Sequence, residues 1–185
     1  KAVNRLFDLE KAEVNINRLK KCGVKMHIDL IAGLPYENYA SFARSFDFVY
    51  SMQPDMLQLG FLKVLNNTAI KNFPGIWYGS FPPFEVLKTN WLSPYEVSFL
   101  KKTENAVDKF YNSGVFPRTI KTLTKNNSPF AVFEKLGKAL SKEEEEGKLS
   151  RVKLYDLLYE FGGEKIVQDL TFDFLKNNKN APLPR

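Results

Sequence analysis

The sequence predicts an α/β fold in which two parallel strands with flanking helices are followed by an α-helical appendage. Three observations lead to this prediction. The apolar stretch VKMHIDLIAGLP, residues 24–35, lies between two segments with helical periodicity. A second strand-like stretch, residues 56–65, begins 32 residues after the first, and one right-handed β-α-β unit needs roughly 30 residues. Beyond residue 115 the apolar residues recur only at helical spacing.

Local start and stop signals place the first two helices. Asp8 is a suitable N-cap for a helix over residues 9–22, and Gly23 can end that helix in the left-handed conformation. Asn38 can cap a second helix that extends to about Met52, where Gln53-Pro54 follows. The first 65 residues therefore read as helix, strand, helix, strand.

Side chains of the first predicted strand alternate between an apolar and a mixed face. The apolar face carries Val24, Met26, Ile28 and Leu30, and the mixed face carries Lys25, His27, Asp29 and Ile31. In a parallel sheet covered by helices, the mixed face would point into a barrel or toward a ligand. Asp29 and Ile31 would then lie near the carboxyl end of the strand, where parallel α/β folds place their sites.

Two parallel strands do not form a stable sheet alone, because their faces and edges need covering. We therefore expect further β-α units before Lys1, so that this chain holds the end of a barrel-like sheet. The missing N-terminal half would be its natural partner. Without that half, we expect the isolated chain to self-associate through an unpaired strand edge.

The second half of the chain is predicted to be mainly helical. Residues 66–91 carry turn signals and at most a short strand at 84–87. Ser93-Pro94 and Ser128-Pro129 each combine a capping serine with a proline at the first helical position, and Ser150 can cap a further helix. A last helix is expected from about Glu164. The predicted divisions are 1–115 for the barrel part, 116–178 for a helical domain and 179–185 for a loose tail.

Composition narrows the class of protein. The net charge of +6 comes from lysines spread along the chain, which favours a solvated basic surface over a nucleic-acid site. The single cysteine, Cys22, excludes an internal disulfide or a site with several thiolates within this sequence. No apolar run reaches the ~18 residues of a membrane span, and no signal peptide opens the chain. We expect a cytoplasmic protein without a membrane partner.

Asp29 is the sharpest candidate for binding. A carboxylate on the inward face of a parallel strand accepts hydrogen bonds from ribose hydroxyls, and the alternative is a structural acceptor for nearby loop backbone. Ile31 would supply an apolar wall beside the same ligand, although an inward isoleucine can equally belong to a core. Gly33, followed by Leu34 and Pro35, lets the backbone turn sharply off the strand.

Three further positions carry weaker signals. Gln58 and Gly60 share one face of the second strand, where a glycine allows a ligand to approach the backbone or marks a bulge or a packing constraint. His27, the only histidine, is interpreted as a buried structural hydrogen-bonding group rather than a general acid or base. Cys22 is expected to be inert.

Several strings in the chain resemble those of a known family. DLIAGLP (29–35), a helix with Phe42, PD (54–55) and LQLGFLKVL (57–65) resemble the late barrel of radical S-adenosylmethionine (SAM) proteins. WLS (91–93) and YNSG (111–114) bring the chain closest to bacterial radical SAM proteins that carry an N-terminal cobalamin-binding domain. The resemblance covers most of the chain and implies no activity for its helical C-terminal third.

The resemblance implies the C-terminal part of a partial (β/α)6 TIM-like barrel and an enzyme of the iron-sulfur oxidoreductase or methyltransferase type. In this family, a CxxxCxxC loop holds a [4Fe-4S] cluster that cleaves SAM to a 5′-deoxyadenosyl radical, and an upstream domain binds cobalamin. This chain lacks that loop, so it would be inactive alone. The substrate stays open, and the alternative is a non-catalytic binding or interaction module with a basic surface.

The family's functional positions can be carried over to matching residues of this chain. Asp29 matches a ligand of the SAM ribose, Ile31 matches an adenine contact, and the backbone from Phe61 to Lys63 would face the adenine. The full predicted cofactor-binding set is Asp29, Ile31, Gly33, Gln58, Gly60, Phe61 and Lys63.

Overall fold

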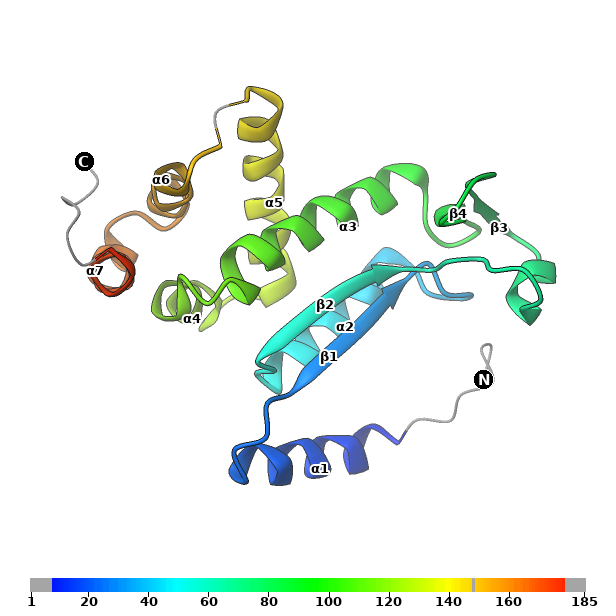
Figure 1. The fold of residues 1–185 in the computed structure, drawn as a ribbon, viewed down its shortest axis with the longest axis horizontal. Coiled ribbons are helices and arrows are strands. Elements are labelled where there is room, and N and C mark those ends of the chain that lie inside the picture. The colour runs from blue at the N-terminus through cyan, green and yellow to red at the C-terminus, as the bar shows by residue number, and fades with distance from the viewer. Residues whose placement is uncertain (1–7, 148, 179–185) are drawn as a thin grey trace. The chain divides into compact units, whose positions relative to one another are not determined.

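The computed structural model describes residues 8–147 and 149–178 (Figure 1). The expectations for residues 1–7 and for the tail 179–185 lie outside the described residues. The chain is a mixed α/β protein with a small parallel sheet and a majority of helix. It divides into two compact units, residues 1–100 and 101–185. The domain division proposed at residue 115 stays a prediction.

The first unit begins with the predicted helix-strand-helix-strand order. The four elements are α1 (Leu9–Lys21), β1 (His27–Ala32), α2 (Tyr39–Ser51) and β2 (Met56–Phe61). Both helix starts are confirmed by their caps, because Asp8 accepts the N–H of Lys11 at 3.0 Å and Asn38 accepts that of Ser41 at 2.8 Å. Gly23 follows α1 with φ +76°, as its place after the helix predicts.

Strands β1 and β2 are parallel neighbours, but both are shorter than predicted. The first starts at His27 because Met26 instead bonds to Asp55. The Met26 N–H donates to the Asp55 carboxylate, and the Asp55 N–H donates to the Met26 carbonyl, both at 2.8 Å. The second ends at Phe61 because the chain then begins to change partner, although Leu62 still donates its N–H to the carbonyl of Ala32 at 2.9 Å. Leu62 accepts the N–H of Val86 at 2.8 Å. No closed barrel is formed by the described residues.

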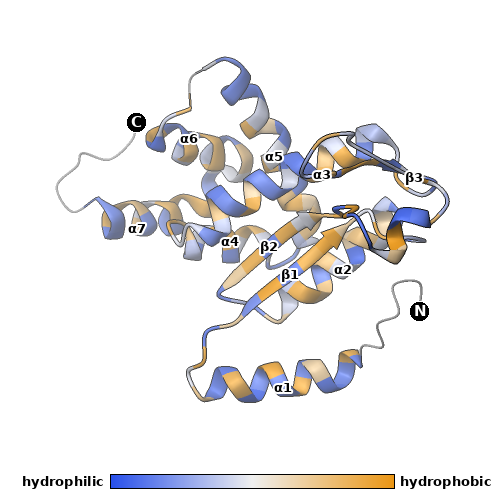
Figure 2. Ribbon diagram, turned by 45° about the vertical axis from the view of Figure 1, so that its right-hand side comes forward, coloured by the Kyte–Doolittle hydropathy of each residue, from blue (hydrophilic) through white to orange (hydrophobic). Residues whose placement is uncertain are grey.

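Helix α2 covers one face of the two strands (Figures 1 and 2). Phe42 and Phe46 of α2 are buried, as are Leu57 and Leu59 of β2. Helix α1 is different, because none of its residues is buried. Ile16 is half-buried, and three other apolar residues are among the exposed large hydrophobic groups of the chain, namely Leu9, Val14 and Leu19.

The rest of the first unit contains a hairpin that sequence patterns largely missed. A 3₁₀ turn, η1 (Ala69–Asn72), precedes the antiparallel strands β3 (Ile76–Tyr78) and β4 (Val86–Thr89). The sequence indicated a loop with at most a strand at 84–87. A three-residue strand among turn residues carries too little periodicity to be recognised.

Helix α3 (Pro94–Ala106) begins at the predicted Ser93-Pro94 start and continues into a π-helical segment, η2 (Val107–Asn112). The second unit adds four further helices and a 3₁₀ turn, which are α4 (Pro117–Thr124), α5 (Pro129–Glu145), α6 (Arg151–Gly162), η3 (Gly163–Ile166) and α7 (Val167–Asn177). The predicted caps of α5 and α6 are confirmed, since Ser128 accepts from Ala131 and Ser150 accepts from Lys153, each at 3.2 Å.

Helix α4 was not predicted, because its N-terminus has no cap of its own. The cap comes from Asp173 on α7, which is fully buried. Its carboxylate accepts the N–H of Thr119 at 2.9 Å and the Thr119 hydroxyl at 2.8 Å. These bonds join residues 54 positions apart in the sequence, so no local sequence pattern predicts them.

Aromatic side chains form the core of the second unit. The ring of Phe116 lies 4.8 Å from that of Tyr155, which in turn lies 5.1 Å from Phe174. Gly137 brings α5 against the backbone of α3, since a Cβ there would lie 2.6 Å from the carbonyl carbon of Lys102. The two helices therefore pack closer than any larger residue at position 137 would allow.

Candidate functional site

The parallel strands present one face that no described element buries. We call this the open face. It is formed by register pairs of β1 and β2, because side chains of paired residues in a sheet lie on the same side. The pairs are His27 with Met56, Asp29 with Gln58, and Ile31 with Gly60. Four of the seven predicted binding residues, Asp29, Ile31, Gln58 and Gly60, therefore lie side by side.

The Asp29 carboxylate is accessible on this face. Its side chain is 64% exposed, and its Oδ1 lies 3.0 Å from Nε2 of His27, whose side chain is 50% exposed. The interpretation of His27 as a buried structural group is therefore wrong. Two residues apart on a strand, the two side chains point the same way and meet in solvent. Asp29 is the third of six residues in β1, farther from the carboxyl end than expected.

Ile31 and Gly60 form an apolar strip nearer the carboxyl end. The Ile31 side chain is 44% exposed. A Cβ built on Gly60 would meet only the carbonyl oxygen of Leu30, at 3.7 Å. No packing among the described residues therefore requires glycine at position 60. A flat group can lie against bare backbone there with Ile31 beside it.

Three predicted residues lie away from the open face. Gly33 has φ +90°, and a Cβ there would lie 2.7 Å from Cγ1 of Val86, so its turn and its packing against β4 both require glycine. Phe61 is buried on the face that α2 covers. Lys63 pairs through its backbone with Glu85, and its carbonyl accepts the N–H of Leu65 at 3.1 Å.

A half-buried carboxyl group lies just past the carboxyl end of β1, and the sequence analysis missed it. Glu37 Oε2 is buried without a hydrogen-bond partner among the described residues. Burial raises the pKa of Glu37 from 4.5 to about 7. A carboxyl that exchanges its proton near neutral pH is suited to proton transfer. The only sequence signal was its place directly after GLPY, since a loop glutamate is ordinarily solvated.

Aromatic rings line the same end of the strands. Tyr36 has φ +66°, an uncommon value for a residue with a side chain. Its ring lies 4.8 Å from that of Trp91 and 5.9 Å from that of Phe73, yet the residue is 66% exposed. The left-handed backbone thus directs an aromatic ring outward beside the half-buried Glu37.

The site joins hydrogen-bonding groups to an apolar strip. Asp29 offers an anionic acceptor, Gln58 offers an amide that both donates and accepts, and Ile31 offers an apolar wall. Among residues 8–147 and 149–178, no group of three or more histidine, cysteine or acidic side chains has the geometry to hold a metal ion. The arrangement suits a polar ligand that carries hydroxyl groups and a flat ring.

None of the helices in the described part of the chain has the length and apolar character needed to cross a membrane. No curated protein and no solved structure matches the chain. One family model does match, over residues 71–185, which is more than half of the chain. The match includes β3, β4 and all the helices from α3 onward but not the open face. By that match, the chain belongs to the family described as "Protein of unknown function (DUF4080)".

Proposed function

We propose that this chain is the C-terminal part of a radical SAM enzyme and that its open face forms part of the SAM-binding wall of a partial (β/α)6 barrel. The observation that carries the proposal is the accessible pair of Asp29 and Gln58 on parallel strands whose other face is buried. The DLIAGLP and LQLGFLKVL strings support it, and the matched family is itself associated with radical SAM and cobalamin proteins.

The open face fits the SAM molecule in chemistry. The ribose carries two vicinal hydroxyls, which an exposed carboxylate such as Asp29 can accept together. Gln58 lies beside Asp29 in the register and can bond to the same sugar or to the amino acid end. The adenine ring can lie over the bare backbone of Gly60 against Ile31. The ribose, the adenine and the amino acid end would thus each meet a residue of suitable polarity.

The chain does not fit the iron-sulfur cluster, because it has one cysteine and that residue is exposed at the end of α1. The thiolates would come from the missing N-terminal half. With such a cluster, SAM supplies a 5′-deoxyadenosyl radical. The role of the present chain is to bind and orient SAM, and we assign it no cobalamin ligand.

The test uses the longer natural protein. Asp29→Asn keeps the shape and removes the anionic acceptor. A lost charged hydrogen bond is worth roughly 1.5 to 3 kcal/mol, so SAM should bind about ten- to hundredfold more weakly. Asp108→Asn changes an exposed carboxylate on η2 and is the matched control. Calorimetric titration with SAM measures affinity, and thermal melts of each variant measure folding.

Two results would separate the interpretations. Weaker SAM binding by Asp29→Asn alone, with an unchanged melting temperature, supports a ligand role. Unchanged SAM affinity with a lower melting temperature would show that Asp29 is a structural acceptor. Three upstream cysteines at CxxxCxxC spacing would independently support the class of enzyme.

A further inference from the structure

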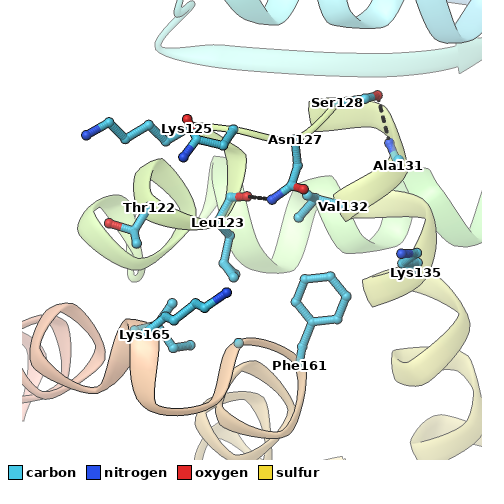
Figure 3. A pocket seen from close by; sticks show the side chains of 13 residues that line it. Thr122, Leu123, Lys125, Asn127, Ser128, Ala131, Val132, Lys135, Phe161 and Lys165 are labelled. Atoms are coloured by element: carbon cyan, nitrogen blue, oxygen red, sulfur yellow. Dashed lines mark hydrogen bonds between the residues drawn. The ribbon is translucent and has the colours of Figure 1, made fainter.

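The second unit contains a pocket unrelated to the open face. It is formed by the loop between α4 and α5, the first turns of α5, and the junction of α6 with η3 (Figure 3). We call it the lysine pocket, after Lys125, Lys135 and Lys165 in its lining. Its volume is about 520 Å³, within the range of roughly 300–1,000 Å³ that small-molecule sites occupy.

The charge of the pocket is of one sign. Three lysines line it, and none of the lining residues is acidic. Two carboxylates lie on neighbouring positions. Glu134 on α5 pairs outside the lining with Lys138 at 2.9 Å, whereas Asp169 on α7 accepts the hydroxyl of Thr122, a lining residue, at 2.6 Å. The lining itself therefore carries three positive charges and no negative one, and Asp169 lowers the positive potential only from outside the lining, at Thr122.

The floor of the pocket is apolar. Leu123 and Val132 are buried, whereas Phe161 is 37% exposed and faces the open space. Figure 3 shows the Lys165 side chain extending toward the space between Leu123 and Phe161. A cation thus lies directly beside an aromatic and aliphatic surface.

The loop that forms the rim is held by its own hydrogen bonds. Asn127 Nδ2 donates to the carbonyl of Leu123 at 2.8 Å, and Ser128 Oγ accepts from the N–H of Ala131 at 3.2 Å (Figure 3). The lining is therefore shaped before any ligand arrives, which lowers the entropy cost of binding.

We propose that the lysine pocket binds an amphipathic anion, a phosphate or carboxylate group joined to an apolar body. The anionic group meets the ammonium groups of Lys135 and Lys165, and the apolar body lies on Phe161 and Leu123. The inference is independent of the proposed SAM site.

Phenyl phosphate is the probe, and the full 185-residue chain is the sample. Titrations followed by ¹H–¹⁵N chemical shifts compare the binding of phenyl phosphate with that of inorganic phosphate and of phenol. We expect shifts at residues 122–135 and 161–166, and binding at least about tenfold tighter than either partial probe. Lys135→Gln and Lys165→Gln should each weaken binding about three- to fivefold, as expected for partly exposed charges.

Matched controls keep the test decisive. Lys142→Gln changes an exposed lysine on α5 outside the pocket and should leave binding unchanged. Vesicles of phosphatidylglycerol also attract a chain of net charge +6 without any pocket, so a lipid headgroup is the ligand only if Lys165→Gln loses the retention that Lys142→Gln keeps. Equal affinity for phenyl phosphate and inorganic phosphate, or equal loss in Lys142→Gln and Lys165→Gln, would overturn the proposal.

Discussion

Glu37→Gln should stabilise the chain at pH 8 and change its stability little at pH 4. Burial raises the pKa of the folded carboxyl from 4.5 to about 7. The folded state therefore binds this proton more tightly than the unfolded state does. Stability is lost as pH rises from 4.5 through about 7. Below that window both states are protonated, so the group makes no difference there.

The magnitude follows from the size of the shift. A rise from 4.5 to about 7 corresponds to an upper limit of ~3 kcal/mol. Because the carboxyl is partly exposed, solvent screening lowers the expected gain at pH 8 to about 1–2 kcal/mol. Glutamine has nearly the same shape and no charge to desolvate, so the gain should appear without repacking.

Urea unfolding of wild type and Glu37→Gln at pH 4, 6 and 8 measures the effect. The matched control is Glu160→Gln, an exposed carboxylate on α6 that should show no such pH dependence. A stability difference between wild type and Glu37→Gln that is the same at all three pH values would refute the reasoning. So would a loss of stability in Glu37→Gln at pH 8.

Three further predictions concern the caps, the packing and the sheet edge. Ser93→Ala removes the hydroxyl that accepts the N–H of Glu96 at 3.3 Å and donates to its carboxylate at 2.7 Å, and it should cost about 1 kcal/mol in urea unfolding, while Ser98→Ala within α3 should cost much less. Gly137→Ala drives a Cβ into the backbone of Lys102 and should cost about 1–3 kcal/mol, whereas Gly60→Ala meets nothing closer than 3.7 Å and should be tolerated. The isolated chain should self-associate as concentration rises, because the described residues leave an edge of the parallel sheet unpaired, and a monodisperse monomer in light scattering at high concentration would contradict this.

Local sequence signals determined where most of the helices begin. Asp8, Asn38, Ser128 and Ser150 each accept a backbone N–H three residues on, as predicted. A cap acts within one turn, so the residues that make it are adjacent in the sequence. The alternation of side chains between the two faces of β1 was equally predictable from the sequence. A strand has a period of two, so Asp29 and Ile31 share one face whatever lies around them.

Tertiary structure decided the features that depend on distant partners. Helix α4 starts where Asp173 of α7 meets Thr119, and β1 starts late because Asp55 bonds Met26. Glu37 acquires its raised pKa only because the folded chain buries it past the end of β1. The sequence by itself determined which residues share a face or a turn. Only the fold decided which of them lose water and which meet a partner, because both depend on contacts between segments far apart in the chain.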